Sequence, residues 1–176
     1  MLTTTEFAVL TVLTVETQDR AVSGYDLLKI VERSVGYLWK PTKSHLYSVL
    51  PRLVERGLAT RRSAPGERGP DRQLYRVSKK GERLAQAWLE ETVPGDHELF
   101  RLKVFYGGLM SREALVAHYR QHREDRQAAL DELRAIEPTN TRKGHDYFHY
   151  FLLRLGIERA EHDVRWAEEA LQELEA

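Results

Sequence analysis

The residues with the most evident binding chemistry in this 176-residue chain lie close together, between positions 42 and 57. Their polar side chains are hydrogen-bond donors and cations, with a single acid, Glu55, late in the stretch. Donors gathered on one exposed surface suit a polyanion, because they reach phosphate oxygens and the edges of bases. The predicted contacts to nucleic acid are Lys43, Ser44, His45, Tyr47, Ser48 and Arg52. The alternative interpretation is a solvated helix surface that binds nothing.

One amphipathic helix over residues 43–56 positions these donors. Apolar residues recur at the spacing i, i+3, i+4, i+7 and i+8, which predicts a buried face made of Leu46, Val49, Leu50, Leu53 and Val54. Thr42 is expected to cap the N-terminus, and Gly57 to supply the left-handed residue after the C-terminus. Pro51 lies inside the helix, where it removes the hydrogen bond to the Tyr47 carbonyl and predicts a bend.

Two helices are expected before this one. A capping box formed by Thr3 and Glu6 starts a first helix that ends near Glu16. Ser23 caps a second helix, which ends near Gly36. The second helix and the basic helix after it are joined by a short connection, and this arrangement is typical of a helix-turn-helix.

A β-hairpin is expected directly after the basic helix. Residues 58–63 and 73–78 are short, roughly alternating stretches rich in strand formers, and two Gly and two Pro lie between them. The order of three helices and a hairpin is that of a winged helix, with the hairpin as the wing. Arg68 and Arg72 at its tip are predicted to contact phosphates or to enter a minor groove. The alternative is a floppy surface loop.

The second half of the chain reads as helical throughout. Ser78 caps a fourth helix, and the acidic stretch 90–96, with its adjacent Pro and Gly, is the expected domain boundary. We therefore predict a winged-helix domain over 1–92 and a helical domain over 93–176. Further helices are expected over 96–107, 112–137 and 142–173. The predicted fold class is mainly α, a winged helix-turn-helix with a two-stranded wing followed by an all-α domain.

The last helix carries a sustained apolar repeat. Its apolar positions alternate steps of three and four residues over 24 residues, at Tyr150, Leu153, Ile157, Ala160, Val164, Ala167, Leu171 and Leu174. This period of 3.5 residues is typical of a coiled-coil seam. We expect the seam to join two copies of the chain rather than to pack only within one. The predicted dimerisation residues are Leu153, Ile157, Val164, Leu171 and Leu174.

Charge is distributed unevenly although the formal net charge is zero. Residues 1–92 carry 15 Lys and Arg against 11 Asp and Glu, and residues 93–176 carry 12 against 16. Within 40–80 the count is 11 against 3, a balance of +8. A basic patch on an otherwise neutral chain is the electrostatic footprint of nucleic-acid binding.

Composition also limits where the protein works. The chain has no Cys, so disulfides and thiolate chemistry are excluded, which fits a reducing cytoplasm. No apolar run is long enough to cross a membrane, and the N-terminus lacks a secretion signal. A cytoplasmic protein without a membrane partner is therefore expected.

Several of these stretches resemble the PadR-type transcriptional regulators. The matching residues are Ser-Gly-Tyr-Asp-Leu at 23–27, Trp39-Lys-Pro-Thr-x-x-x-Leu-Tyr47-x-x-Leu50-x-Arg-Leu-x-x-x-Gly57-Leu58, and Gly69-Pro-Asp-Arg-Gln-Leu-Tyr75-x-Val-Ser-x-x-Gly81. The second half is also similar, in Leu99-Phe-Arg-Leu-Lys-Val-Phe-Tyr and Leu155-Gly-Ile-Glu-x-Ala-Glu-x-x-x-x-Trp166. The family often has Pro directly after the recognition-helix Tyr, where this chain has Ser48, and a Thr where it has Ser78.

The resemblance implies a dimeric DNA-binding repressor, which is usually released by a small-molecule effector or by changed expression of partners. A two-fold dimer would hold its recognition helices about 34 Å apart and would require an inverted-repeat operator. The expected partners are double-stranded DNA, a second copy of the chain and a small-molecule effector. The residues proposed to wall an effector pocket are Trp88, Tyr150 and Trp166.

Three other functions remain open at this point. The pairs His118/His122 and His145/His149, with His162, have metal-ligand spacing and raise a metal-responsive regulator as an alternative. An enzyme is not expected, because the chain has no phosphate-binding loop, no nucleophile elbow and no Cys. We accordingly predict no catalytic residues, no resident metal and no cofactor. A winged helix used only for protein contacts is the third alternative.

Overall fold

The computed structural model describes residues 2–65, 71–137 and 143–176. The chain forms two compact units, and each is described by itself. The first consists of residues 1–91 together with 101–110, and the second of residues 92–100 together with 111–176. The division expected from the sequence, after residue 92, does not include the return of residues 101–110 to the first unit.

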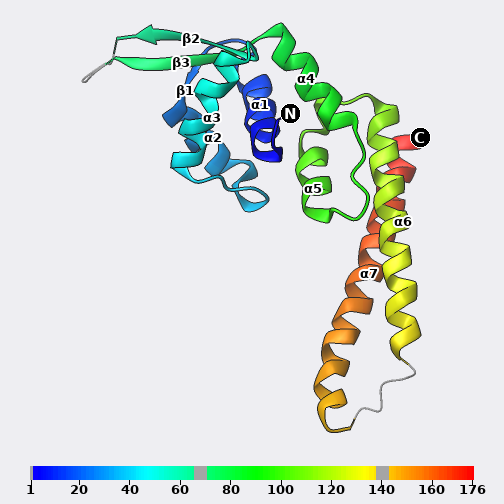
Figure 1. Cartoon of the computed structure of the whole chain (residues 1–176). Helices are drawn as coiled ribbons and strands as arrows, with labels where there is room; N and C mark the ends of the chain where they lie inside the picture. Colours follow the sequence, from blue (N-terminus) through cyan, green and yellow to red (C-terminus); the bar gives the residue numbers. More distant parts are fainter. Residues whose placement is uncertain (1, 66–70, 138–142) are drawn as a thin grey trace. The chain divides into compact units, whose positions relative to one another are not determined.

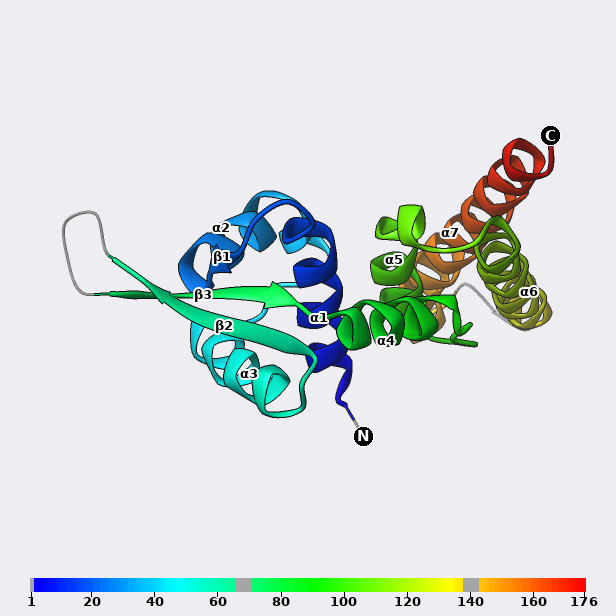
Figure 2. The ribbon, with the colours of Figure 1, turned by 90° about the horizontal axis from the view of Figure 1, so that it is seen from above.

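The first unit is a winged helix. Its elements are α1 (Thr4–Glu16), β1 (Val22–Ser23), α2 (Gly24–Arg33), the 3-10 turn η1 (Val35–Tyr37), α3 (Lys43–Glu55), β2 (Ala59–Ala64), β3 (Arg72–Val77) and α4 (Lys79–Glu90). The strands form an antiparallel sheet in the order β1-β3-β2. Figure 1 shows the β2–β3 hairpin lying over α1, α2 and α3, and Figure 2 shows it reaching out past α2 and α3. The predicted helix-turn-helix with a hairpin wing is confirmed.

The helix starts follow the expected caps. Thr3 and Glu6 form a complete capping box at α1, and the Ser23 hydroxyl accepts a hydrogen bond from the Asp26 amide at α2. Thr42 accepts from the amide of His45 at a distance of 3.2 Å between the two atoms. Ser78 and Ser111 cap the next predicted helices in the same way. These contacts form within four residues, which is why the sequence alone predicts them.

The core of the first unit surrounds α1. Side chains from α1, α2, α3 and α4 bury completely there, among them Leu10, Leu13, Leu27, Leu46, Leu50, Leu53 and Leu89. The apolar face predicted for α3 is thus in the core, except that Val54 is only half-buried. Pro51 lies inside a helix that continues to Glu55. This packing leaves the opposite face of α3 in solvent.

Gly81 joins the wing to the core. A Cβ at this position would overlap the carbonyl oxygen of Leu58, at the start of the hairpin. That carbonyl accepts a hydrogen bond from the Ser78 amide, and the amide of Gly81 donates to the Ser78 hydroxyl. Only glycine allows α4 to pass this close to the hairpin.

A buried cation closes the end of α4. Lys103, from α5 (His97–Phe105), is fully buried, and its Nζ donates to the carbonyl oxygens of Trp88 at 2.5 Å and Glu91 at 2.6 Å. The last carbonyls of a helix have no partner inside the helix, and a positive charge there interacts favourably with the helix dipole. Burial lowers the pKa of Lys103 to about 8. The 3-10 turn η2 (Gly107–Leu109) follows α5.

The second unit is built on two long helices, α6 (Arg112–Ile136) and α7 (His145–Glu175). The helices lie side by side along most of their length (Figure 1). The apolar repeat of α7 accounts for this pairing, because Leu153, Ala160, Val164, Ala167 and Leu171 are buried within the single chain, whereas Ile157 and Leu174 are half-buried. The seam we expected to join two copies is therefore largely covered by the chain itself. Self-association through it stays a prediction.

The length and polarity of the helices bear on membrane insertion. Among the residues that the structure places, no helix is both long enough and apolar enough to span a bilayer.

Candidate nucleic-acid interface

The exposed face of α3 presents the donors predicted from the sequence. Lys43, Ser44, His45, Tyr47 and Ser48 are all exposed, with 42% of the Tyr47 surface accessible. The face lies at the N-terminal end of α3, where free backbone amides and the helix dipole both favour phosphate. The Nζ of Lys43 lies 5.9 Å from the centroid of the Tyr47 ring. The first two turns of α3 thus combine a cation, an aromatic hydroxyl and small hydroxyls.

Helix α2 supports the Tyr47 ring from behind. A Cβ added to Gly24 would lie 3.2 Å from Cε1 of Tyr47 and 3.2 Å from Cδ1 of Leu50. Gly24 begins α2, so the first turn of α2 packs directly on α3. The Ser-Gly-Tyr-Asp-Leu stretch therefore has a physical role: its Ser caps α2, and its Gly lets α2 approach the exposed face of α3.

Arg52 has a different environment from the other predicted contacts. Its Nε lies 3.5 Å from a carboxylate oxygen of Glu6 and donates to the Ser48 carbonyl at 3.2 Å. Glu6 is almost completely buried, and Arg56 approaches the same carboxylate at 3.9 Å. The hydrogen bond from the Thr3 amide, with the charges of Arg56 and Arg52, lowers the pKa of Glu6. Arg52 fastens the end of α3 to α1, and its contact with DNA stays a prediction.

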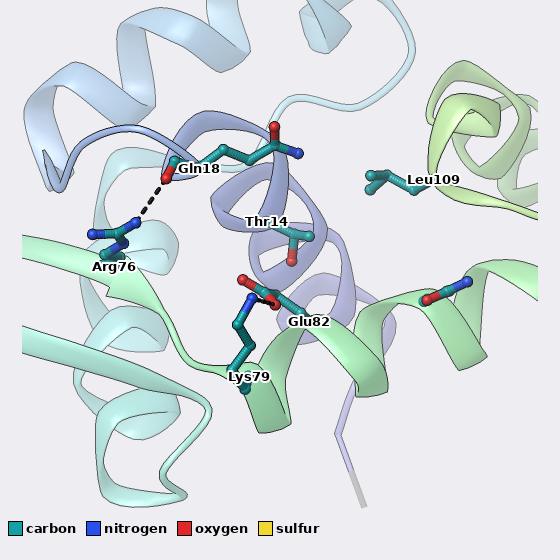
Figure 3. A pocket seen from close by; sticks show the side chains of 7 residues that line it. Thr14, Gln18, Arg76, Lys79, Glu82 and Leu109 are labelled. Carbon is teal, nitrogen blue, oxygen red and sulfur yellow. Dashed lines mark hydrogen bonds and ion pairs between the residues drawn. The ribbon is translucent and has the colours of Figure 1, made fainter.

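The wing carries a second set of exposed cations. Arg61, Arg62, Arg72 and Arg76 are exposed, and none of them has an ion pair with another residue that the structure describes. The Nη2 of Arg76 donates to the Gln18 carbonyl at 2.7 Å, which holds this guanidinium at the rim of a hollow between β3, α1 and α4 (Figure 3). Of the wing arginines, only Arg68 and Arg72 are predicted from the sequence to contact DNA. Arg68 lies outside the described residues.

The three residues expected to wall an effector pocket belong to different units. Trp88 is in the core of the first unit, where it stacks on Phe7 with ring centroids 5.1 Å apart. Trp166 belongs to an aromatic cluster of the second unit, and its ring centroid lies 5.3 Å from that of Tyr119 and 6.2 Å from that of Phe100. Tyr150, near the start of α7, is half-buried. Their participation in one pocket stays a prediction.

The histidines divide into buried and exposed groups. His118 and His122 on α6 are buried, whereas His145, His149 and His162 on α7 are exposed. His122 stacks on Phe100 with centroids 4.0 Å apart, and burial lowers its pKa to about 4. No set of three His, Cys, Asp or Glu arranged to hold a metal ion occurs in residues 2–65, 71–137 or 143–176. The histidine spacing suggested a metal site, but the described residues do not bring three possible ligands together.

Taken together, the first unit defines a class: a winged helix-turn-helix with an exposed basic recognition helix and a basic wing. The sequence profile of the PadR-like family of transcriptional regulators matches residues 9–87, and the profile described as virulence activator alpha C-terminal matches residues 98–175. The first unit of the chain belongs to the PadR-like family of transcriptional regulators.

The chain is also similar to known proteins over most of its length. The negative transcriptional regulator PadR of Bacillus subtilis is 26% identical over 164 residues, which cover 85% of this chain and 88% of that protein. A crystal structure of that protein in complex with operator DNA covers 98% of this chain and 99% of its own, at 24% identity and a TM-score of 0.47. A crystal structure of the same protein in complex with p-coumaric acid covers 96% of this chain and 99% of its own, at 21% identity and a TM-score of 0.42.

Proposed function

We propose that this transcriptional regulator is a repressor that binds an inverted-repeat operator as a homodimer. The observation that carries the proposal is the set of exposed donors on α3 beside wing arginines that have no acidic partner among the described residues. Phosphate contacts supply most of the affinity of such a surface, and donors at base edges supply its specificity. The negative regulator of Bacillus subtilis crystallised with operator DNA supports the same function.

In the proposed complex α3 enters the major groove with its N-terminal half. Tyr47 and His45 are the side chains proposed to reach base edges, while Lys43, Ser44 and Ser48 contact flanking phosphates. Arg72, on the wing, is proposed to contact the adjacent backbone or minor groove, as is Arg68 beyond the described residues. Arg52 contributes by holding α3 against α1 through Glu6, and its contact with a phosphate is part of the proposal.

The homodimer is proposed to form through a face of α7 that its own chain leaves open. Five large apolar residues near the start of α7 remain exposed at the spacing of one helix face: Tyr147, Phe148, Phe151, Leu152 and Leu155. Phe148 is 68% exposed and Leu152 71%, and contiguous exposed apolar patches often mark protein–protein interfaces. A second copy of the chain would bury this patch. The same interface would also cover Ile157 and Leu174, the two seam residues that are only half-buried within one chain.

The remaining features of the proposed function are a cytoplasmic location, no enzymatic activity and control by a small molecule. The p-coumaric acid complex of the Bacillus subtilis protein supports a small-molecule effector for a regulator of this kind. An effector would act by changing the spacing of the two recognition helices, because an inverted repeat accepts only one spacing.

A gel-shift experiment with the DNA directly upstream of the protein's own gene tests the proposal. It compares the wild type, the double variant Tyr47→Ala with Arg72→Ala, and the control Arg120→Ala with Arg154→Ala at two salt concentrations. A discrete shift is expected for the wild type and the control, weaker at high salt, and absent in the double variant. If the wild type shifts no DNA at either salt concentration, or the double variant shifts it equally well, the proposal is wrong.

A further inference from the structure

A hollow on the wing includes none of the residues of α3 that are proposed to reach base edges. It has a volume of about 450 Å³ and is lined by residues from three separate stretches: Asp19, Arg20, Ala21, Thr60, Arg61, Arg62, Leu74 and Arg76. The first three residues belong to the connection between α1 and β1, and the others to β2 and β3. All three stretches belong to the first unit.

The sheet register places the strand residues Thr60, Arg62 and Arg76 of this hollow on one face of the sheet. Ala59 pairs with Val77, and both are buried against the core. Thr60 pairs with Arg76 and Arg62 pairs with Leu74, so the polar side chains of these pairs share the other face. Thr60, Arg62 and Arg76 are exposed there.

The hollow is strongly cationic. Four arginines and one carboxylate, that of Asp19, line it. By the register, the side chain of Arg61 lies on the face of Ala59, so Arg20, Arg62 and Arg76 are the arginines available to a ligand in the hollow. The side chains of Arg20, Arg61 and Arg62 have no hydrogen bond or ion pair with another residue that the structure describes. Like charges gathered around one concave surface repel one another, and this repulsion is relieved when an anion binds among them.

One of the four guanidinium groups is held in place. Arg76 donates from Nη2 to the Gln18 carbonyl at 2.7 Å, the bond drawn in Figure 3. A guanidinium has five donors in a rigid fork, so this bond leaves several of them for a ligand. The fork geometry matches two oxygens of one phosphate.

We propose that this hollow is a binding site for a phosphate group, with Arg20, Arg62 and Arg76 as its ligands. The phosphate can come from a free phosphoanion or from a nucleic-acid backbone that wraps beyond the wing. Asp19 weakens the site, since its carboxylate lies beside the bound anion. Binding at this site does not require the proposed repressor function.

Titration calorimetry of the full-length protein with inorganic pyrophosphate tests the first source. The test variant is Arg20→Ala with Arg62→Ala, and the matched control is Arg33→Ala with Arg83→Ala, which removes two exposed arginines of the same unit away from the hollow. We expect saturable binding to the wild type and the control, weakened about tenfold or more in the test variant. Asp19→Asn should tighten binding. The melting temperature of each variant establishes that it is folded.

DNA binding of the same variants tests the second source. If the phosphate comes from DNA, the slope of log affinity against log salt falls by about 0.9 for each phosphate that the test variant no longer neutralises, and by less in the control. If the test variant loses pyrophosphate binding but keeps the wild-type slope of log DNA affinity against log salt, the ligand of the site is a free phosphoanion. If the test and control variants behave alike in both measurements, the proposed phosphate site is wrong. Pyrophosphate binding by a wild type that binds no DNA would retain this site while contradicting the repressor function.

Discussion

The arginines of the wing and those of the α6–α7 pair have different neighbours. In the second unit, Arg120 pairs with Glu175 at 2.6 Å, Arg134 with Glu161 at 2.8 Å, and Arg154 with Glu158 at 3.2 Å. Arg126 lies 3.6 Å from Asp163. On the wing, Arg61, Arg62 and Arg72 have no acidic partner among the described residues.

The difference indicates which set of charges can attract a polyanion. Paired charges on a surface add little to stability, but they leave no net field to attract a polyanion. Unpaired cations add nothing to stability and are available to phosphate. The zero net charge of the chain hides these two opposite arrangements. Four experiments can break or sharpen the comparison.

Charge reversal should separate the two sets most strongly. Arg61→Glu with Arg72→Glu on the wing is expected to lower DNA affinity about 100-fold, because two attractive contacts become repulsive. The matched variant Arg120→Glu with Arg154→Glu should change affinity less than about threefold. Fluorescence anisotropy with one labelled DNA measures both. Equal losses would show that the whole charge of the protein, and not the wing, attracts DNA.

The exposed apolar face of α7 should control assembly without contacting DNA. Phe148→Asp with Leu152→Asp is expected to convert a dimer into a monomer and to weaken operator binding about tenfold or more, since a monomer reaches only half of the phosphates. Light scattering measures the mass. Arg159→Asp, an exposed change on the same helix, is the control. A double variant that stays dimeric places the interface elsewhere.

Acid should destabilise the second unit at a higher pH than the first. Burial, with the nearby His97, lowers the pKa of His122 from 6.5 to about 4, against the weaker opposing effect of Asp163 and Asp125. Stability from the neutral imidazole is complete above pH 6.5 and falls as the pH drops toward 4, because the unfolded state then binds the extra proton. Between pH 6.5 and 4 the free energy of unfolding falls by at most about 1.4 kcal/mol per pH unit.

The first unit has the opposite type of group. The pKa of Glu6 is lowered from 4.5, so the stability it provides is present above pH 4.5 and is lost only below it. Thermal melts from pH 7 to 4 test the difference, with His122→Phe as the variant that keeps the stack on Phe100. This variant should flatten the fall in melting temperature between pH 6.5 and 4. A fall as steep as that of the wild type would mean that other groups cause it.

Removal of a single surface pair should have the smallest effect. Arg134→Ala breaks the ion pair with Glu161 and is expected to cost about 0.2–1 kcal/mol of unfolding free energy. DNA affinity should not change. Urea unfolding of the wild type and of Arg134→Ala measures the first quantity. A loss above about 2 kcal/mol would show that the pairs of the second unit are important for stability, contrary to the comparison.

Local features of the fold could be read from the sequence, whereas long-range pairings could not. Thr42 and Ser78 cap helices through contacts three residues away, and the apolar period of α3 predicts its buried face directly. Strand β1 was missed because two residues, Val22 and Ser23, carry no strand pattern of their own. A heptad repeat also does not say which helix fills its seam, and α6 does so here.

The candidate site shows the same limit. Exposed donors on α3 follow from helical spacing, and the structure leaves them exposed as expected. The engagement of Arg52 by Glu6 joins residues 46 positions apart, so no local pattern predicts it. The hollow on the wing brings together Arg20, Arg62 and Arg76 from three stretches, and only the folded structure reveals that they line one surface.

The measurement that tests the central claim most directly is the salt dependence of DNA affinity for the wild-type protein. The claim is that unpaired cations on α3 and the wing are used to bind DNA phosphates. Anisotropy titrations with the upstream DNA at several salt concentrations should give a slope of log affinity against log salt of about −4 or steeper, as expected when five or more phosphates are neutralised. A slope near zero, or no binding at the lowest salt concentration, would contradict the account.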